Sequence, residues 1–338
     1  MSVGSTHIKA EKHGTLGLLT LNRPQALNAL DHAMILALTA RLRTWAADDS
    51  IETVAIRGEG MRAFCSGGDI RAVRQAAVAG NDAGIALLRD EYRMNAMIGA
   101  YPKPYIALIH GICMGGGAGI SVHGSARLAD ASLIFAMPET GIGFIPDVGA
   151  SYFLSRLPDE LGMYLGLTGL SIGLGDALDA GLMTHAVASE DFDAVIDALA
   201  AGKEFTPFVR KREKGLLAAN RRRIATVFAG SSVEAILERL DRDGSDFAQA
   251  TAQTIRTRSP TSLKLVFRQL RFARELTLRE CLAMEFRLAN RVLVSHDFRE
   301  GIRAALLDKD RNPRWEPASL AGVGDLESYF APLRDELF

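Results

Sequence analysis

Two acidic residues, Glu139 and Asp147, combine a residue type and a setting that could do chemistry. Each directly follows a proline, and the apolar stretch between them contains Gly141 and Gly143. The segment therefore reads as a rigid loop and not as a helix. Acids in apolar surroundings carry raised pKa values, and two close together separate theirs. Such tuning is common at functional sites, so we predict acid–base or nucleophilic chemistry for this pair.

Two glycine-rich turns could bind an oxygen atom. They read CSGGD at Cys65–Asp69 and CMGGGAG at Cys113–Gly119. Glycine lets backbone N–H groups approach a ligand closely, and one donor from each turn would form an oxyanion hole for a polarised carbonyl. The second turn also opens a helix, whose dipole favours negative charge. Either turn alone is equally typical of a tight strand-to-helix connection.

Other kinds of site find little support. The sequence has no HExxH, no GxSxG elbow and no P-loop, and its histidines show no metal-ligand spacing. The three cysteines, Cys65, Cys113 and Cys281, include no CxxC pair, which favours a reducing compartment and argues against disulfides or zinc. We interpret the two that lie in the glycine turns as small buried thiols and predict no metal site.

Strands and helices alternate in the first two hundred residues. We expect a hairpin at His7–Leu21, a helix at Ala29–Ala47, a strand at Thr53–Arg57, a helix at Ala83–Ala100, a buried strand at Pro104–Ile109, a helix from Gly115 to about Ala126 and a strand at Ser132–Ala136. This pattern predicts an α/β fold with parallel strands. Ligands gather at the carboxyl ends of such strands, where the turns around Gly68, Gly116 and Glu139 lie.

After about Ala201 the patterns become helical. Four helices are expected, at Val233–Leu240, Phe247–Arg258, Ser262–Glu275 and Leu278–Val294. We therefore predict a core of residues 1–200 and a mostly helical region of residues 201–338. A basic cluster at Arg210–Arg223 is typical of a solvated helix face, and a phosphate contact or a partner surface stays open.

Composition limits the partners. A formal net charge of −1 over 338 residues gives no global field for nucleic acid. No apolar run reaches the roughly 18 residues that span a membrane. The first residues, MSVGSTHIKAEKHG, lack the apolar core of a signal peptide and the character of a transit peptide, so we expect a cytoplasmic protein.

Four motifs together resemble the crotonase, or enoyl-CoA hydratase/isomerase, superfamily. They are Leu21–Pro24, Ala63–Asp69, His110–Gly117 and Met137–Gly143, in order and at compatible spacing. The resemblance implies a crotonase-like spiral of ββα units with a helical C-terminal region, and an acyl-CoA thioester as partner. It implies an oxyanion hole from the backbone amides of Gly68 and Gly116. It implies no cofactor, since CoA is part of the substrate, and a possible trimer or hexamer.

Two departures point to a subfamily. Gly119 stands where hydratases carry a second glutamate, and Asp147 stands where they usually have glycine. The stretch Pro138–Pro158 is similar to the 3-hydroxyisobutyryl-CoA hydrolase subfamily. So are Ile120–Gly124, Arg89–Tyr92, Ser259–Lys264, His296–Gly301 and Leu307–Trp315. This likeness implies that Glu139 and Asp147 carry catalysis and that Glu91, Gly116, Glu139 and Asp147 contact the substrate.

The resemblance leads us to expect hydrolysis of a short 3-hydroxyacyl-CoA, in valine breakdown. The acyl group, 3-hydroxyisobutyryl or 3-hydroxypropionyl, differs by one methyl and stays open. So does the choice between direct attack by Glu139, through a mixed anhydride, and activation of water by Glu139. Arg62, beside the first turn, is a candidate for the CoA phosphates. An enoyl-CoA isomerase, a hydratase and a non-catalytic binding subunit remain alternatives.

Overall fold

The computed structural model describes residues 7–71, 73, 75, 80–212 and 214–338. The chain divides into two compact units built from interleaved segments. Unit 1 comprises Met1–Asp69, Asp90–Phe135 and Ile172–Leu216, and unit 2 comprises Ile70–Arg89, Ala136–Ser171 and Leu217–Phe338. The boundary predicted at residue 200 divides the chain at one point into two consecutive parts, and it stays a prediction.

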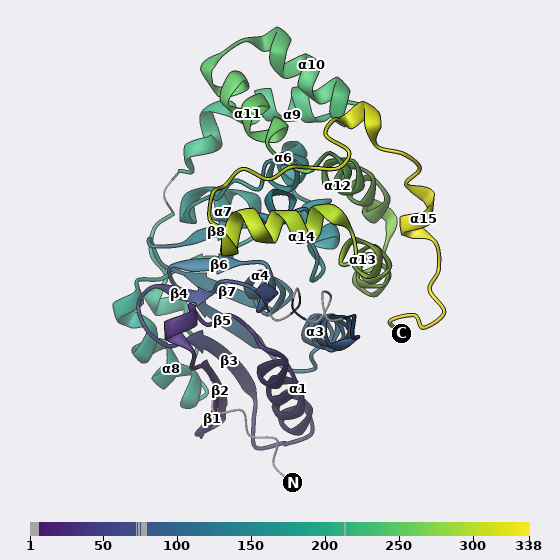
Figure 1. The fold of residues 1–338 in the computed structure, drawn as a ribbon. Helices are drawn as coiled ribbons and strands as arrows, with labels where there is room; N and C mark the ends of the chain where they lie inside the picture. The colour runs from purple at the N-terminus through teal and green to yellow at the C-terminus, as the bar shows by residue number, and fades with distance from the viewer. Residues whose placement is uncertain (1–6, 72, 74, 76–79, 213) are drawn as a thin grey trace. The chain divides into compact units, whose positions relative to one another are not determined.

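A six-stranded sheet forms the centre of unit 1, with the strand order β1-β2-β3-β5-β7-β9 (Figure 1). Its strands are β1 (Ile8–His13), β2 (Leu16–Leu21), β3 (Thr53–Gly58), β5 (Tyr105–Ile109), β7 (Ala126–Ala129) and β9 (His185–Ala186). The first two pair antiparallel as a hairpin, and the others pair parallel. Every residue of β5 is buried, as expected of a strand covered on both faces. The predicted hairpin and parallel α/β sheet are confirmed.

A second sheet has three short strands in the order β4-β6-β8. They are β4 (Ala63–Cys65), β6 (Ile112–Met114) and β8 (Ile134–Ala136). The first glycine turn follows β4, the second follows β6, and Glu139 follows β8. The prediction that the candidate turns lie at strand ends is therefore confirmed.

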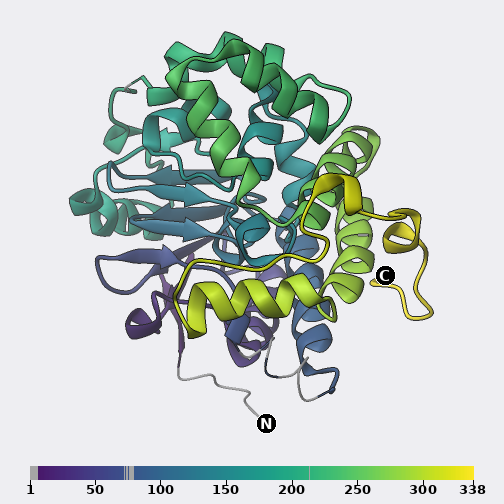
Figure 2. The same ribbon diagram turned by 45° about the horizontal axis from the view of Figure 1, so that its top comes forward.

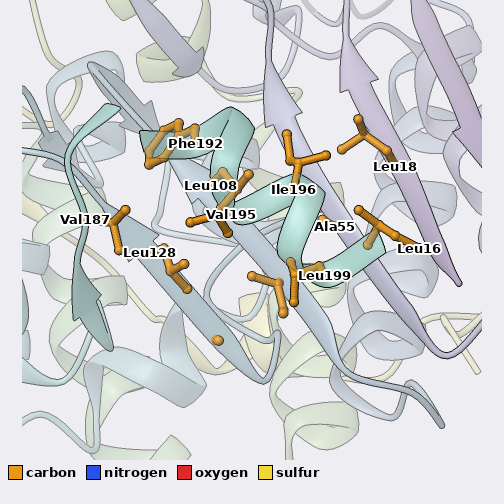
Figure 3. Packing of buried hydrophobic residues seen from close by; sticks show 12 residues of the cluster. Leu16, Leu18, Ala55, Leu108, Leu128, Val187, Phe192, Val195, Ile196 and Leu199 are labelled. Atoms are coloured by element: carbon orange, nitrogen blue, oxygen red, sulfur yellow. The ribbon is translucent and has the colours of Figure 1, made fainter. Parts of the chain in front are cut away.

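Helix α8 (Phe192–Ala200) packs on one face of the larger sheet (Figure 3). Four of its buried side chains recur at helical spacing: Phe192, Val195, Ile196 and Leu199. They meet alternate residues of the strands, among them Leu16, Leu18, Ala55, Leu108 and Leu128. Burying a side chain of this size stabilises a fold by about 1.5–3 kcal/mol, so this layer holds the strands in place.

The other helices of unit 1 frame the sheets. They are α1 (His32–Ala46), α4 (Gly116–Gly119) and α7 (Leu174–Ala180), while α3 (Ala83–Gly99) passes from unit 2 into unit 1. The helix predicted from Gly115 to about Ala126 is wrong in extent, since α4 ends at Gly119. Its end is set by β7, which pairs with β5, and by the hydroxyl of Tyr105, which donates to the carbonyl of Ile120 at 2.9 Å.

The C-terminal part of unit 2 is helical, and the described residues 217–338 contain no strand. Its helices are α9 (Arg221–Phe228), α10 (Val233–Asp243), α11 (Asp246–Arg256), α12 (Pro260–Phe272), α13 (Leu278–Val292), α14 (His296–Ile302) and α15 (Glu327–Phe330), coloured green to yellow in Figure 2. Two more, α5 (Ala150–Leu154) and α6 (Leu161–Thr168), come from the middle segment. Serine or threonine caps four of the C-terminal helices where predicted helices begin, so the helical region is confirmed.

The described residues show neither a membrane-spanning helix nor a cluster of metal-ligating side chains. No helix there is both long and apolar enough to cross a membrane. No group of three or more His, Cys, Asp or Glu side chains in the described ranges could hold a metal ion.

Candidate active site

The first glycine turn is held by the segment that precedes α1. The N–H of Leu30 donates to the carbonyl of Gly67 at 2.8 Å, and the N–H of Asp69 donates to the carbonyl of Leu30 at 2.8 Å. Arg23 pairs with the Asp69 carboxylate at 3.0 Å. Gly67 adopts φ +115°, which favours glycine. The Leu21–Pro24 and Ala63–Asp69 motifs thus form one support for Gly68.

The second glycine turn lies against the first within unit 1. Gly115 has φ +48° and begins α4. A Cβ placed at Gly116 would lie 3.2 Å from the backbone nitrogen of Gly68. Within the described residues, no acceptor takes the N–H of either Gly68 or Gly116. Two adjacent free amides are the arrangement that an oxyanion hole requires.

Glu91 of α3 lies against both turns. Its side chain is buried, with 2% exposed. A Cβ at Gly116 would lie 2.5 Å from its Oε1, and a Cβ at Gly68 would lie 3.8 Å from its Oε2. Residue patterns alone suggested an ordinary helix-face acid, and only the family resemblance singled it out. The structure brings it together with Gly68 and Gly116.

The remaining residues of unit 1 that the sequence singled out are Cys65, Cys113 and Arg62. Cys65 and Cys113 are free and fully buried, and burial raises the pKa of both thiols, that of Cys113 to about 12. Neither thiol is therefore a nucleophile at neutral pH, and the prediction of buried thiols is confirmed. Arg62 is exposed, next to β4.

In unit 2, Glu139 begins the short 3-10 helix η2 (Glu139–Ile142) and is 7% exposed. The turn closes at Gly143 with φ +67°, where a Cβ would lie 2.3 Å from the carbonyl oxygen of Asp297. Only glycine fits there. The Oε2 atom of Glu139 is buried, and no described residue donates a hydrogen bond to it. A buried polar atom without a partner is rare and suits a water or a ligand.

Motifs from the helical region support this turn. The N–H of Ser259 donates to the carbonyl of Thr140 at 3.2 Å, and its hydroxyl donates to Asp297 at 2.5 Å. The N–H of Glu316 donates to the other oxygen of Asp297 at 2.8 Å. A Cβ at Gly301 would lie 2.3 Å from the carbonyl carbon of Ile142. The C-terminal segments that carry the resemblance therefore fix the backbone of η2.

Asp147, also in unit 2, is 6% exposed and stands before a strained turn. Val148 adopts φ +54° and Gly149 adopts φ +84°. A β-branched residue rarely takes this left-handed conformation, which costs about 1–3 kcal/mol. The side chain of Gln269 donates to the carbonyl of Pro146 at 2.8 Å on the other side of Asp147. Such strain clusters at functional sites.

The charge of Asp147 raises the pKa of two other buried acids of unit 2, Glu139 and Glu285. Burial raises the pKa of Glu139 well above its usual 4.5, and the charge of Asp147 raises it further. Burial also raises the pKa of Glu285 to about 8, against opposing hydrogen bonds and with a smaller contribution from Asp147. Asp147 therefore lies close enough to interact with both glutamates. Glu285 was missed in the sequence, where it is one acid in the amphipathic helix α13.

We expect Glu139→Gln to stabilise the fold, and more so at higher pH. The pKa of Glu139 is raised on folding, so the folded protein keeps a proton that the unfolded chain releases above about pH 4.5. Stability then falls as pH rises, by about 1.4 kcal/mol per unit until the folded pKa is passed. The variant escapes this loss, while Glu285 contributes equally to both proteins. Urea unfolding at about pH 5 and about pH 8 measures the gap; a gap that does not widen contradicts the prediction.

The basic cluster Arg210–Arg223 is largely neutralised, and Glu213 within it lies outside the described residues. Four of its arginines form ion pairs: Arg210 with Asp191, Arg212 with Asp179, Arg221 with Asp159 and Arg223 with Asp243. Lys211 and Lys214 line a cavity of about 440 Å³ in unit 1. The ion pairs fit a solvated surface.

Comparison with known proteins supports the resemblance. The family model described as enoyl-CoA hydratase/isomerase matches residues 16–330. A relative from Xenopus tropicalis, named 3-hydroxyisobutyryl-CoA hydrolase, mitochondrial, is 45% identical over 95% of this chain and 88% of its own. Relatives of the same name from Danio rerio and Homo sapiens are each 43% identical over 96% of this chain and 88% of theirs.

These relatives overturn the expected cytoplasmic location, because each of them is named as mitochondrial. The expectation rested on the lack of a recognised targeting pattern in the first residues. Such a lack does not define a compartment, and the expectation was wrong.

Two solved structures share the fold over nearly the whole chain. A carnitinyl-CoA dehydratase from Mycobacterium thermoresistibile has a TM-score of 0.95 at 39% identity, covering 99% of both chains. An enoyl-CoA hydratase from Rhodobacter sphaeroides 2.4.1 has a TM-score of 0.92 at 39% identity, covering 97% of this chain and 98% of the other. These likenesses confirm the predicted fold, and the chain belongs to the enoyl-CoA hydratase/isomerase family.

Proposed function

We propose that this protein hydrolyses a short 3-hydroxyacyl-CoA thioester, 3-hydroxyisobutyryl-CoA above all, to the free hydroxy acid and CoA. Relatives named for that reaction are 42–45% identical over almost the whole chain, which supports the substrate. A place in valine breakdown is part of the same proposal, and it rests on the resemblance to the 3-hydroxyisobutyryl-CoA hydrolase subfamily. A substrate with one methyl less, 3-hydroxypropionyl-CoA, should be disfavoured by about 10–200-fold at most.

The observation that carries the proposal is the pair Glu139 and Asp147. Both are buried, and the charge of Asp147 raises the pKa of Glu139. A carboxylate whose pKa is raised is a stronger base and a better nucleophile than an ordinary one. Hydration of a double bond uses a second glutamate at the position of Gly119, and this chain has no carboxylate there.

The candidate site residues then have separate roles in the proposed reaction. The amides of Gly68 and Gly116 donate to the thioester oxygen and stabilise the charge that develops on it. Glu139 either attacks the carbonyl carbon, giving a mixed anhydride that water opens, or removes a proton from the attacking water. In both routes the C–S bond breaks, a C–O bond replaces it, and the sulfur gains a proton and leaves as the thiol.

Asp147 and Glu91 assist. Asp147 orients the water or delivers the proton to the leaving sulfur. Glu91, buried beside Gly68 and Gly116, accepts a hydrogen bond from the 3-hydroxyl group of the substrate. This contact would favour hydroxyacyl over plain acyl thioesters, because only the hydroxyacyl group can donate that hydrogen bond. Arg62 is exposed. In the proposed complex it contacts the CoA phosphates.

A hydratase is the second candidate, and a specific observation favours it. The two solved structures reported above are described as a carnitinyl-CoA dehydratase and an enoyl-CoA hydratase, each at 39% identity. An isomerase would need only one carboxylate, which Glu139 could provide. Loss of enoyl absorbance from crotonyl-CoA would identify the hydratase, and a shifted double bond would identify the isomerase.

The deciding experiment measures thiol release from 3-hydroxyisobutyryl-CoA by the wild type and by Asp147→Asn. We expect rapid release by the wild type. The variant should be about 10²–10³-fold slower, because the amide neither accepts nor delivers the proton. Crotonyl-CoA hydration should be negligible in both. Absence of thiol release by the wild type would refute the proposal, and full activity in the variant would remove Asp147 from the mechanism.

A further inference from the structure

The chain just after Asp147 holds a conformation that it would not keep unaided. Val148 and Gly149 both lie in the left-handed region, at φ +54° and φ +84°. Valine is branched at Cβ and disfavours this region. Strained backbone of this kind persists only where neighbouring groups fix it. The source of that restraint therefore matters for the position of Asp147.

Glu285 supplies three of the hydrogen bonds that fix the turn. It lies on α13 (labelled in Figure 1), with none of its surface exposed. Its Oε2 accepts from the N–H of Gly149 at 2.7 Å. Its Oε1 accepts from the N–H of Ser151 at 2.8 Å and from the hydroxyl of Ser151 at 2.5 Å. Both carboxyl oxygens are thus used, and all three donors lie within four residues of Asp147.

We propose that Glu285 is a positioning residue for catalysis: by accepting from Gly149 and Ser151 it holds the strained turn that aims Asp147. The inference rests on the proposed function, in which Asp147 handles the water or the leaving thiol. Glu285 itself touches neither substrate nor reacting atoms in this scheme.

The stability of the fold does not by itself explain why a glutamate occupies buried position 285. Burial raises the pKa of Glu285 to about 8, so keeping a charge there is unfavourable, and the charge of Asp147 adds to the cost. A buried ionisable group is weak evidence for stability and is often replaceable by apolar residues. The geometry offers a reason, because only a carboxyl group can accept from both sides of the turn at once. A glutamine of the same shape has one oxygen, and its NH₂ would face an N–H.

The first test compares Glu285→Gln with Leu288→Ala at a temperature where both are folded. Leu288 is a fully buried residue on the same helix and serves as the control for general loosening. We expect kcat for thioester hydrolysis to fall about 30–300-fold in Glu285→Gln with KM within about 3-fold, as when a transition-state contact is lost. Leu288→Ala should keep kcat within about 3-fold. Equal losses in the two variants would overturn the proposal.

A second variant covers the case in which Glu285→Gln does not fold. Ser151→Ala removes only the hydroxyl contact to Glu285 and should lower kcat about 3–10-fold at constant KM. A wild-type kcat in this variant, with Glu285→Gln unfolded, would overturn the proposal.

The final measurement does not depend on activity. Amide hydrogen exchange at Gly149 and Ser151 should be protected in the wild type and faster in Glu285→Gln, while exchange in β5 stays unchanged. Unchanged exchange at these two amides would overturn the proposal. If the wild type releases no thiol, the proposed function fails. Accelerated exchange would then still establish the restraint by Glu285, which keeps the two failures distinguishable.

Discussion

Replacing Glu139 with glutamine is expected to lower kcat for thioester hydrolysis by about 10³-fold or more, while the acyl-CoA still binds. The variant keeps the size and shape of the side chain but can neither attack a carbonyl nor take a proton from water. Its buried Oε2 accepts no hydrogen bond from the described residues, so the substitution breaks none at that atom. Steady-state kinetics and calorimetric titration with CoA measure the two effects.

A control substitution, Glu160→Gln, separates the expected loss of kcat in Glu139→Gln from a general effect of replacing a glutamate. Glu160 pairs with Arg271 and Arg274 and has no part in the proposed reaction. Glu160→Gln should keep kcat within about 3-fold of the wild type and CoA affinity unchanged. Glu139→Gln with the activity of the wild type would exclude Glu139 as nucleophile or base. Loss of CoA binding together with activity would instead indicate a disrupted fold.

Local pattern predicted the elements that bury apolar surface. The continuous apolar run of β5, the helical spacing of α1 and the serine-capped C-terminal helices were each found within a few residues of their predicted ends. Such elements are specified by their own residues. β7, four residues long, was missed, because a strand so short has too few residues to display a period and forms by pairing with β5.

The glycine turns and the acidic loop could be identified in the sequence because their residue types are unusual where they stand. The residues that hold them could not. Glu285 bonds to residues 134 and 136 positions earlier in the chain, and Asp297 meets Ser259 across 38 positions. No pattern near Glu285 or Asp297 in the sequence predicts these partners. Glu91 is similar, since its burial against Gly116 depends on how α3 packs. Only the family resemblance singled it out in advance.

The glycine turn at Gly116 carries the second of the two largest expected effects. Gly116→Ala should lower kcat/KM by about 10²–10³-fold, which corresponds to the roughly 2.7–4 kcal/mol of one oxyanion donor. The added Cβ would lie 3.2 Å from the backbone nitrogen of Gly68 and 2.5 Å from Oε1 of Glu91. In the proposed reaction, it would occupy the place next to both amides that the thioester oxygen takes. Gly116 has no positive φ, so its backbone conformation suits alanine, and the close approach to Oε1 requires the side chain of Glu91 to shift.

The same substitution at Gly173 provides the control, because a Cβ there would have its nearest neighbour among the described residues, the carbonyl oxygen of Leu133, at 3.9 Å. Gly173→Ala should retain full activity, with an unfolding midpoint lowered only slightly because Gly173 is the N-cap residue of α7. Stopped-flow kinetics with 3-hydroxyisobutyryl-CoA, together with thermal unfolding of each variant, separates catalysis from stability. A Gly116→Ala variant that folds normally and hydrolyses the thioester at the wild-type rate would mean that these amides do not bind the reacting oxygen. The developing charge would then have to be stabilised by other donors, and the proposed assignment of Gly68 and Gly116 would be abandoned.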